Sequence, residues 1–317
     1  MTLPQKVRYA TRRSALALAQ CRAFIRELTL ARPGLAAIEL QVVTSGDRIQ
    51  DRPLSEVGGK GLFVKEIEEA LLADRADVAV HSIKDVPGVM PDGLSIVCIP
   101  KRVDPRDVLI APRFGSLMAL PMGAKVGTSS LRRALSLKAR RPDLNIVPLR
   151  GNVDTRLKKV ESGEYDAIVL AAAGLSRLGL LQLGPSQLEP AQLEPGKHAQ
   201  SALDVDVSLP AVGQGALGIE ARAGDDAIAE LLLPLHDPET AVCVWAERGV
   251  MEALEGDCKT PLAAYARRDG AALLMDAFVA EPDGSRFRRL SRSVAWPSER
   301  DANAFGRELG LALRAEQ

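Results

Sequence analysis

The sequence predicts an α/β fold with two similar strand–helix domains followed by a smaller α+β domain. Three observations support this prediction. Short apolar runs alternate with helical patterns over the first two-thirds of the chain, one set of sequence features occurs twice, and the last third has a different pattern. Strand–helix alternation favours parallel or mixed sheets that are covered by helices. The chain has 317 residues, enough for two or three domains with their own cores.

The first strand–helix set begins near the N-terminus. An apolar strand is predicted at residues 7–10, and the following helix, at 14–30, has Ser14 as its N-cap. The set continues with a strand at 38–43, a helix at 62–72 and a short buried strand at 78–80.

Three features of this set recur later in the same order. The matching pairs are residues 8–14 with 125–130, 32–35 with 141–144, and 76–80 with 165–169. The first pair is a strand followed by Thr, Ser and a helix, the second is an Arg-Pro turn, and the third is a strand that follows a helix. Because the order is kept, we expect two domains of similar design.

The remainder of the chain is organised differently. Pro185, Pro190 and Pro195 lie among Gln and Ser residues, which predicts a surface insertion before the chain crosses back. The elements predicted after it are a strand at 216–221, helices at 227–235 and 238–254, strands at 271–279 and 286–294, and a helix at 298–315. Residues 271–274 fit a helix equally well. The expected domains are residues 1–100 with 214–236, residues 104–209, and residues 238–317.

The charges of the chain balance, with 41 basic and 41 acidic residues, but 30 of the basic residues are Arg. A neutral chain is not expected to bind nucleic acid or a membrane surface, because those partners select a basic excess. Arg binds carboxylates and phosphates through two parallel hydrogen bonds, so an Arg-rich set fits a local anion site. A GC-rich genome would produce the same excess of Arg.

Targeting segments and metal motifs are not apparent. No apolar stretch approaches the ~18 residues of a transmembrane helix, and residues 1–9 lack the apolar region of a secretory signal. The four Cys residues form no CxxC pair, and the three His residues lack metal-ligand spacing. We therefore expect a cytoplasmic protein without a metal.

Basic residues follow five of the predicted strands. Ligands of open α/β sheets bind at the carboxyl ends of strands, next to helix N-termini. A single Arg there is often only a solvated surface charge, but a cation at five strand ends predicts a small ligand with several negative charges. The residues concerned are Arg12, Arg13 and Ser14; Lys84 and Asp85; Thr128, Ser129, Ser130, Arg132 and Arg133; Arg150 and Arg156; and Arg177.

The segment His81–Asp85 (HSIKD) is the candidate acid–base site. A carboxylate beside a cation at a strand end can be held in one protonation state by burial and by its partners. From these five residues alone, an exposed Lys–Asp pair in a loop is the simpler interpretation. His81 and Ser82 point to opposite sides of the strand, so a packing role is expected for His81.

A glycine cluster and one cysteine complete the candidates. Gly58–Gly61 (GGKG) precedes a helix without the spacing of a P-loop, so a flexible lid is favoured. Cys258 follows a long helix and adjoins a Lys, where a nucleophilic role and an incidental loop thiol both fit. Cys21, Cys98 and Cys243 lie in predicted helices or a strand and are expected to be packed.

Eight segments, spread over nearly the whole chain, match one known family in the family's order. They are residues 10–14 (ATRRS), 57–66 (VGGKGLFVKE), 81–87 (HSIKDVP), 104–107 (DPRD), 127–133 (GTSSLRR), 149–153 (LRGNV), 209–215 (LPAVGQG) and 247–261, which begins with Glu-Arg and ends with Cys-Lys-Thr-Pro. On these motifs the sequence resembles the porphobilinogen deaminase family.

The resemblance implies two domains like the halves of periplasmic binding proteins, with mixed sheets and a cleft between them. It also implies a cytoplasmic, monomeric transferase of tetrapyrrole synthesis. The family joins four porphobilinogen molecules head to tail into hydroxymethylbilane and releases ammonia at each step. The product grows on dipyrromethane, a cofactor that the enzyme builds and holds through a thioether. The residue that matches the attachment cysteine is Cys258, and no metal is required.

The resemblance also assigns residue roles. Asp85 matches the catalytic acid, which is expected to protonate the departing amine and to stabilise positively charged intermediates. The matching cofactor-binding residues are Ser82, Lys84, Thr128, Ser130, Arg132 and Arg133, and the matching substrate-binding residues are Arg12, Ser14, Lys60, Arg150, Arg156 and Arg177. Each added pyrrole brings two carboxylates, so a growing chain needs several cations in one cleft.

The sequence departs from the family at a few positions. Glu56 stands where some relatives have Lys, Ala15 replaces a common Pro, and Asp257 replaces a small residue beside the attachment cysteine. The negative charge of Asp257 is expected to slow cofactor attachment. A non-catalytic anion-binding module is the rival interpretation, since this two-domain architecture also serves solute binding. The third domain, with its loop cysteine, and the absence of a signal sequence argue against that rival.

Overall fold

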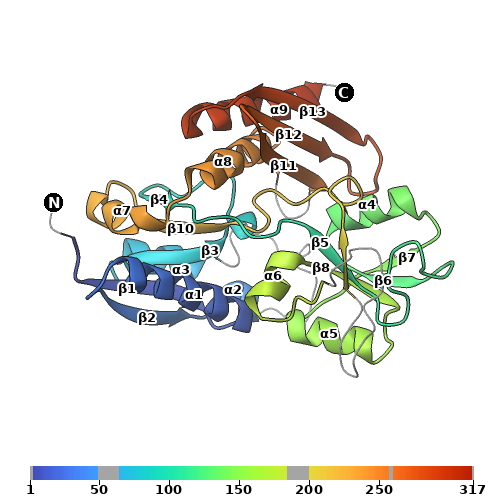
Figure 1. The fold of residues 1–317 in the computed structure, drawn as a ribbon, viewed down its shortest axis with the longest axis horizontal. Helices are drawn as coiled ribbons and strands as arrows, with labels where there is room; N and C mark the ends of the chain where they lie inside the picture. Colours follow the sequence, from blue (N-terminus) through green and yellow to red (C-terminus); the bar gives the residue numbers. More distant parts are fainter. Residues whose placement is uncertain (1–2, 49–63, 184–199, 257–259, 316–317) are drawn as a thin grey trace.

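The computed structural model describes residues 3–48, 64–183, 200–256 and 260–315. The described strands form two five-stranded sheets and one three-stranded sheet. Figure 1 shows the two larger sheets side by side, with the C-terminal sheet and its helices packed above them. This confirms the prediction of two α/β units with mixed sheets and a small α+β unit.

The first sheet has the order β2-β1-β3-β10-β4. Its strands are β1 (Lys6–Arg12), β2 (Ala36–Val42), β3 (Val78–Ser82), β4 (Leu94–Cys98) and β10 (Leu217–Arg222). The strands β1, β2 and β3 run parallel, whereas β10 is antiparallel to both of its neighbours. The helices that accompany this sheet are α1 (Ala15–Ala31), α2 (Ser45–Arg48), α3 (Lys65–Leu72), α7 (Asp226–Leu232) and the short 3₁₀ turn η2 (Leu233–Leu235).

The second sheet repeats this design with the order β7-β6-β8-β5-β9. Its strands are β5 (Asp107–Ile110), β6 (Lys125–Gly127), β7 (Asn145–Val147), β8 (Ala167–Ala171) and β9 (Gln200–Leu203), and its helices are α4 (Leu131–Arg140), α5 (Val153–Glu161) and α6 (Ala172–Arg177). The strands β6, β7 and β8 are parallel, and β5 is antiparallel to its neighbours. The sequence repeat thus corresponds to two sheets built alike.

The C-terminal unit is an antiparallel meander that packs on two helices. Its strands are β11 (Leu262–Asp269), β12 (Ala272–Val279) and β13 (Arg288–Ala295), and its helices are α8 (Pro238–Ala253) and α9 (Glu299–Ala315). Residues 272–279 form a strand, which settles the helix-or-strand ambiguity at this position. The sequence analysis expected only a strand pair here, and β11 is a third strand that it did not predict.

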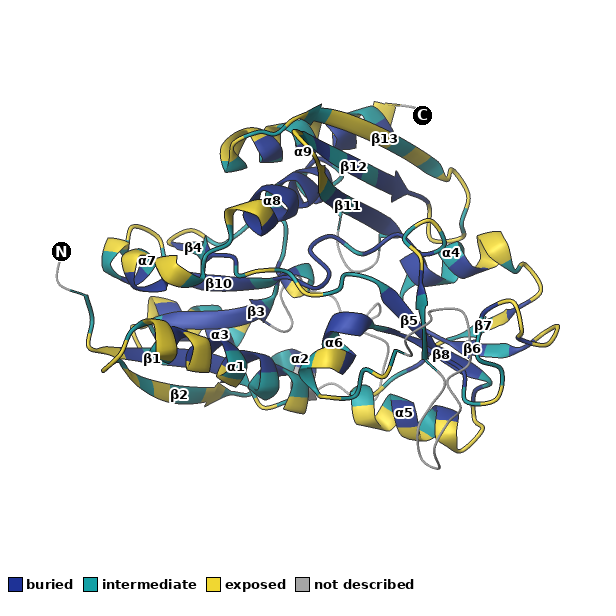
Figure 2. Cartoon of the chain, in the orientation of Figure 1, coloured by how far each residue is buried: buried dark blue, intermediate teal, exposed yellow. Residues whose placement is uncertain are grey.

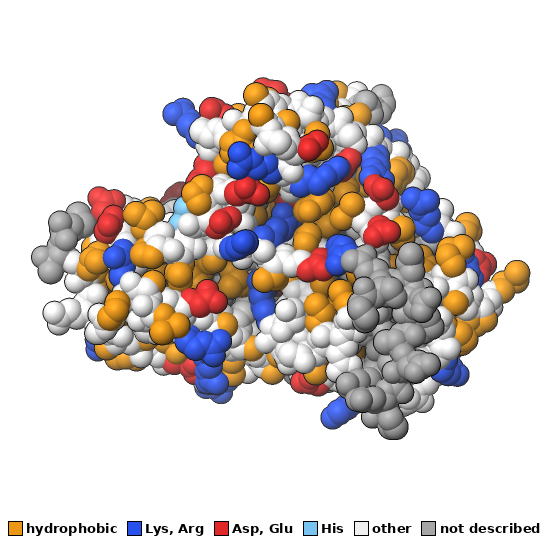
Figure 3. All heavy atoms as spheres, in the orientation of Figure 1, with side chains coloured by type: hydrophobic (Ala, Val, Ile, Leu, Met, Phe, Trp, Pro, Cys, Tyr) orange, Lys and Arg blue, Asp and Glu red, His pale blue; other side chains and the backbone are white. Residues whose placement is uncertain are grey.

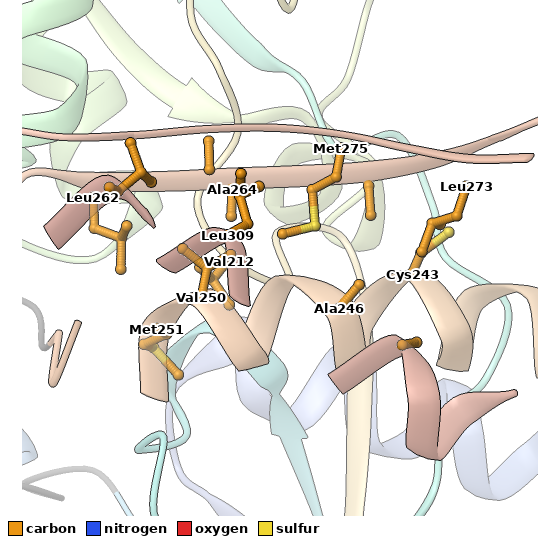
Figure 4. Close-up of a cluster of buried hydrophobic side chains, with 14 of the residues drawn as sticks. Val212, Cys243, Ala246, Val250, Met251, Leu262, Ala264, Leu273, Met275 and Leu309 are labelled. Atoms are coloured by element: carbon orange, nitrogen blue, oxygen red, sulfur yellow. The ribbon is translucent and has the colours of Figure 1, made fainter. Parts of the chain in front are cut away.

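Buried apolar side chains form a separate core under each sheet. In Figure 2 the inner strands and most of α8 are buried, while the outer faces of α1 and α5 are exposed. Figure 4 shows the C-terminal core, where Val250 on α8 points toward the strands that carry Ala264 and Met275, whereas Met251 points away from them. Helix α8 is therefore covered on more than one side, and twelve of its sixteen residues are buried.

Two extended segments connect the larger sheets. Residues 99–106 lead from β4 to β5, and residues 204–216 lead from β9 back to β10. They touch where the N–H of Val103 donates to the carbonyl of Gly215 (3.4 Å). Gly215 has φ +93°, and a Cβ there would lie 2.6 Å from the Val103 oxygen, so this close approach requires glycine. A proline-rich surface insertion was expected at residues 178–206; this was wrong for residues 200–203, which form β9 because they pair with β5, and residues 184–199 lie outside the described residues.

Candidate active site

The predicted acid–base segment lies where the parallel strand β3 ends. Residues Ile83–Asp85 form a 3₁₀ turn, η1, directly after this strand. The N–H of Ile83 donates to the carbonyl of Ala216 (3.2 Å), which ties the turn to the second connecting segment. The Asp85 side chain is exposed and Lys84 is half-buried. The turn therefore presents a carboxylate to a ligand and keeps the neighbouring ammonium against the protein.

A pocket beside η1 brings together residues from two strand ends. Arg12 is the last residue of β1, Ser14 is the N-cap of α1, Ser82 is the last residue of β3, and Asp85 lies in η1; all four line this pocket. The Ser14 hydroxyl accepts from the N–H of Ala17 (3.3 Å) at the start of the helix. Parallel strands place their carboxyl ends at the same sheet edge, so residues far apart in sequence meet here. Sequence analysis placed these residues at strand ends, and the structure brings them together.

A buried charge cluster lies at the corresponding end of the second sheet. The carboxylate of Asp107, on β5, pairs with Arg132 (2.7 Å) and with Arg133 (2.7 Å), both in the first turn of α4. Arg132 also donates to the carbonyl of Leu209 (2.6 Å), yet its buried Nε has no hydrogen-bond partner among the described residues. Two guanidinium groups thus share one carboxylate. Asp107 lies in the 104–107 motif, and the sequence alone predicts no role for it.

The charge of Lys84, at the end of β3 in the first sheet, interacts with the charges of the Asp107 cluster in the second sheet. Burial lowers the pKa of the Lys84 ammonium to about 8; the carboxylates of Asp85 and Asp107 oppose this shift, and the guanidinium groups of Arg132 and Arg133 add to it. These groups interact with Lys84 although they belong to different sheets. Lys84 and the Asp107 cluster therefore form one region of excess positive charge between the two sheets.

More cations belong to the same edge of the second sheet. Thr128 accepts from the N–H of Ser130 (3.2 Å), and Ser130 caps α4 by accepting from the N–H of Arg133 (3.4 Å). Arg156 is half-buried, and its pKa is lowered by burial and then by the charges of Arg133 and Arg150. The positive charges of Arg133 and Arg150 thus repel the charge of Arg156. An anionic ligand would relieve that repulsion.

Arg177, at the end of α6, occupies a different position. Its Nη2 donates to the carbonyl of Gly215 (2.8 Å), and burial lowers its pKa to about 10. It therefore contacts the second connecting segment of the chain. In Figure 3 several Lys and Arg side chains are visible around the middle of the molecule, where the three units meet.

The remaining candidates from the sequence are either buried or lie outside the described residues. Cys21, Cys98 and Cys243 are buried, and burial raises the pKa of each thiol to about 12, which confirms that they are packed. His81 is buried and its Nε2 lies 2.8 Å from the carboxylate of Glu220, as expected for a packing role. The sequence candidates Lys60, Glu56, Asp257 and Cys258 lie outside the described residues, as does the GGKG segment.

This donor set fits a ligand with several carboxylates. The described part of the site holds seven cations from the two larger units, one deeply buried counter-ion, an Nε without a hydrogen-bond partner among the described residues, and several hydroxyl groups. Carboxylates accept hydrogen bonds from such donors and compensate their charge. Within the described residues, no cluster of His, Cys, Asp and Glu is arranged to hold a metal ion.

Comparison with known proteins identifies the family. Residues 7–230 match the family model described as porphobilinogen deaminase, dipyromethane cofactor binding domain, and residues 241–315 match its C-terminal domain. The chain belongs to the porphobilinogen deaminase family. It is similar to porphobilinogen deaminase of Sorangium cellulosum (57% identical, covering 98% of this chain and 99% of that one) and of Thiobacillus denitrificans (51% identical, covering 97% and 94%). Among solved structures it is similar to the Bordetella pertussis BvgS periplasmic VFT2 domain (18% identical, 72% and 85% covered, TM-score 0.40).

Membership fixes the reaction. The enzymes of the porphobilinogen deaminase family are hydroxymethylbilane synthases, transferases of tetrapyrrole synthesis, and this chain is one of them. The family's cofactor is dipyrromethane, which a cysteine holds covalently. No helix in the part of the chain that the structure describes is both long and apolar enough to cross a membrane.

Proposed function

We propose that this chain carries out the family's four condensations with Asp85 as the catalytic acid. The observation that carries the assignment is the position of η1 at the end of β3, where an exposed carboxylate lines a pocket shared with Arg12 and Ser14. The Asp85 carboxyl protonates the departing amine of porphobilinogen. As carboxylate, it then stabilises the positive charge left on that substrate pyrrole. Each of the four condensations uses the carboxyl group of Asp85. Its position must therefore stay fixed while the product chain moves.

The cofactor is proposed to be held by cations and hydroxyls of the facing strand ends. Bound dipyrromethane supplies the free pyrrole carbon to which the first substrate is joined. Its carboxylates are bound by residues on both larger sheets, and Cys258 is the proposed point of attachment. The binding residues are Ser82, Lys84, Thr128, Ser130, Arg132 and Arg133. Arg132 and Arg133 already neutralise Asp107, so their excess positive charge, rather than two free cations, is what remains for the cofactor.

Substrate carboxylates are proposed to bind the cations that surround this core. The residues concerned are Arg12, Ser14, Lys60, Arg150, Arg156 and Arg177. Arg12 and Ser14 share the Asp85 pocket, and Arg156 shares its charge environment with Arg150. Arg177 donates a hydrogen bond to the segment that connects the two larger sheets. A ligand bound to this guanidinium would therefore lie next to that segment.

We propose three domains: residues 1–100 with 214–236, residues 104–209, and residues 238–317. The three sheets and the two connecting segments support this division. The proposed protein is a cytoplasmic monomer that binds porphobilinogen and no nucleic acid. Its equal numbers of basic and acidic residues support the last point.

Intact-protein mass spectrometry tests the cofactor assignment. Protein from a porphobilinogen-producing host is expected to carry an adduct of two pyrrole units, and Cys258→Ser is expected to lack it because the thiolate is the attachment nucleophile. Cys243→Ser is the matched control, since that thiol is buried and should leave the adduct in place. An unmodified wild-type protein would favour the anion-binding module over the enzyme.

Asp85→Asn tests the catalytic acid. Because the side chain is exposed and the change keeps its shape, the variant should fold normally and retain the adduct. Its turnover of porphobilinogen should fall by a factor of about 100 or more, since an amide cannot donate the proton. Near-normal turnover by the adduct-bearing variant would remove Asp85 from this role.

A further inference from the structure

Arg248, on α8 of the C-terminal unit, holds the chain that follows Asp85. Its side chain is 1% exposed. Its Nη2 donates to the carbonyls of Pro87 (2.7 Å) and Gly88 (3.1 Å), and its Nη1 donates to the carbonyl of Val86 (3.3 Å). One guanidinium therefore gathers three consecutive carbonyls, beginning one residue beyond η1.

Breaking the hydrogen bonds between Arg248 and these carbonyls would cost free energy. Burial lowers the pKa of Arg248, partly offset by the charges of Glu252 and Glu220, and an Arg side chain nevertheless keeps its proton in proteins. A buried cation needs its hydrogen-bond acceptors, because leaving it unpaired removes it from water without compensation. The carbonyls of residues 86–88 supply that compensation. The terminal nitrogens of the guanidinium therefore add to the apolar packing that also holds this segment, in which Val86 is buried beside Ile83, whereas Nε of Arg248 has no hydrogen-bond partner among the described residues.

The preceding residue on α8, Glu247, holds a second segment that lies against η1. The Glu247 carboxylate accepts from the N–H of Gly213 (2.6 Å). Gly213 has φ +66°, and a Cβ at this position would overlap the Ile83 side chain, so Gly213 lies directly against η1. Two adjacent residues of one helix therefore hold two segments that adjoin η1, Glu247 through Gly213 and Arg248 through residues 86–88.

Helix α8 also starts the chain toward the attachment cysteine. It ends at Ala253, and the N–H of Gly256 donates back to the carbonyl of Met251 (2.9 Å). Gly88 lies against the same part of the helix, since a Cβ there would be 3.5 Å from Cγ of Glu252 and 3.6 Å from Cε of Met251. Helix α8 thus lies against Gly88, in the segment that follows Asp85, and leads into the segment that carries Cys258.

We propose that Arg248 is a positioning residue that sets the place of Asp85 by holding the carbonyls of residues 86–88. The proposal rests on the acid role of Asp85. Arg248 is not among the described residues that line the Asp85 pocket, so its loss should leave the anion-binding cations in place. Displacement of the acid then lowers kcat, whereas binding of porphobilinogen, measured through KM, changes little.

The test compares variants of the full chain purified with their cofactor. In Arg248→Met we expect the dipyrromethane adduct to be retained, kcat to fall by about tenfold or more, and KM to change by less than about threefold. Hydrogen exchange of the amides in residues 83–90 should become faster. Arg248→Lys should recover part of the kcat, because its ammonium can still donate to these carbonyls. Arg314→Met is the control, since its guanidinium pairs only with Glu255 in the described structure and both side chains are exposed.

The outcomes separate this proposal from the acid assignment. An Arg248→Met enzyme with wild-type kcat, or with slow kcat but unchanged exchange at residues 83–90, overturns the positioning role while Asp85→Asn remains inactive. Active Asp85→Asn overturns the acid assignment instead. If Arg248→Met does not fold, Arg248→Gln is judged by the same measurements. Failure of both variants to fold would show a purely structural role and also overturn the proposal.

Discussion

Among the individual residues of the site, Asp107 neutralises part of the positive charge by pairing with Arg132 and Arg133. Burial alone would raise the pKa of this carboxyl, but the charges and hydrogen bonds of Arg132 and Arg133 outweigh burial and hold it far below its usual range. A depressed pKa contributes stability at pH values above the ordinary range of Asp, and this contribution is lost only as the pH falls through the depressed value. The cluster therefore stays ionised throughout the neutral range, with one cation in excess.

Lys84 makes ligand binding depend on pH near neutrality. Burial lowers its pKa to about 8, so the ammonium loses its proton as the pH rises through that value. A neutral amine no longer attracts the carboxylates of the proposed cofactor, so formation of the dipyrromethane adduct on cofactor-free protein should slow between pH 7 and 9.5. In Lys84→Arg the cation stays charged, so the part of this slowing that belongs to Lys84 should disappear. Intact-protein mass spectrometry of both proteins during incubation with porphobilinogen gives the comparison, and identical pH profiles of adduct formation would contradict the prediction.

The sequence predicted which strand ends carry the charged residues of the site, but not which of these residues are buried. Lys84 and Asp85 were expected at a strand end because strand and helix patterns are local, and the structure places them there. The burial of Arg132 and Arg133 against Asp107 was not expected, because that pairing joins residues 25 and 26 positions apart through the fold of a whole sheet. A charged residue at the start of the fully buried run DVLI was the available signal.

Among the elements, helices α8 and α9 approach each other through glycine. Gly249 and Gly310 face backbone of the opposite helix, and a Cβ at Gly310 would lie 2.9 Å from the carbonyl oxygen of Val250. Absence of side chains lets the two backbones touch. Because α8 also carries Glu247 and Arg248, this contact supports the element that holds the Asp85 turn.

Gly306→Ala tests the close contact of α8 with α9. A Cβ at this position would overlap the Ala246 carbonyl, which is backbone and cannot rotate away. We expect a loss of about 1–3 kcal/mol in the free energy of unfolding, despite the higher helix propensity of Ala. Leu311→Ala is the control, since this side chain is half exposed on the same helix and should change stability by less. Urea unfolding gives both values, and equal stability of the two variants would contradict the argument.

Element prediction succeeded where helical periodicity and capping were strong. The helix predicted at 238–254 is observed at Pro238–Ala253, with Asp237 as its N-cap, and the helix predicted at 298–315 is observed at Glu299–Ala315. Strand β5 has only four residues, all buried, and such a run cannot be distinguished from a buried helix segment by periodicity. Strand β11 begins Leu-Ala-Ala, a poor strand signal, and it becomes a strand because it pairs with β12 over a buried face.

For the whole molecule, the two connecting segments determine how the larger sheets are held together. Strand β10 returns to the first sheet only after the second sheet is complete, so the chain crosses between them twice. The buried Glu247 carboxylate accepts from Arg102 (2.6 Å) on one crossing, from Gly213 on the other, and from the N–H of Ala266 (2.9 Å) in β11. All three units thus meet at one carboxylate.

Arg102→Met should therefore weaken the junction of the three units. The variant leaves the fully buried Glu247 without its cation, and removing one partner of a buried pair costs about 3–5 kcal/mol. Arg106→Met on the same crossing is the matched control. Arg106 pairs with Asp104 two residues away, both are partly exposed, and the expected cost is below about 1 kcal/mol. Thermal unfolding should show a much lower Tm for Arg102→Met, and limited proteolysis should cut residues 99–106 faster. Equal melting temperatures for the two variants would show that Glu247 is compensated by its two backbone N–H donors alone, and the junction would then depend on hydrogen bonding rather than on the ion pair.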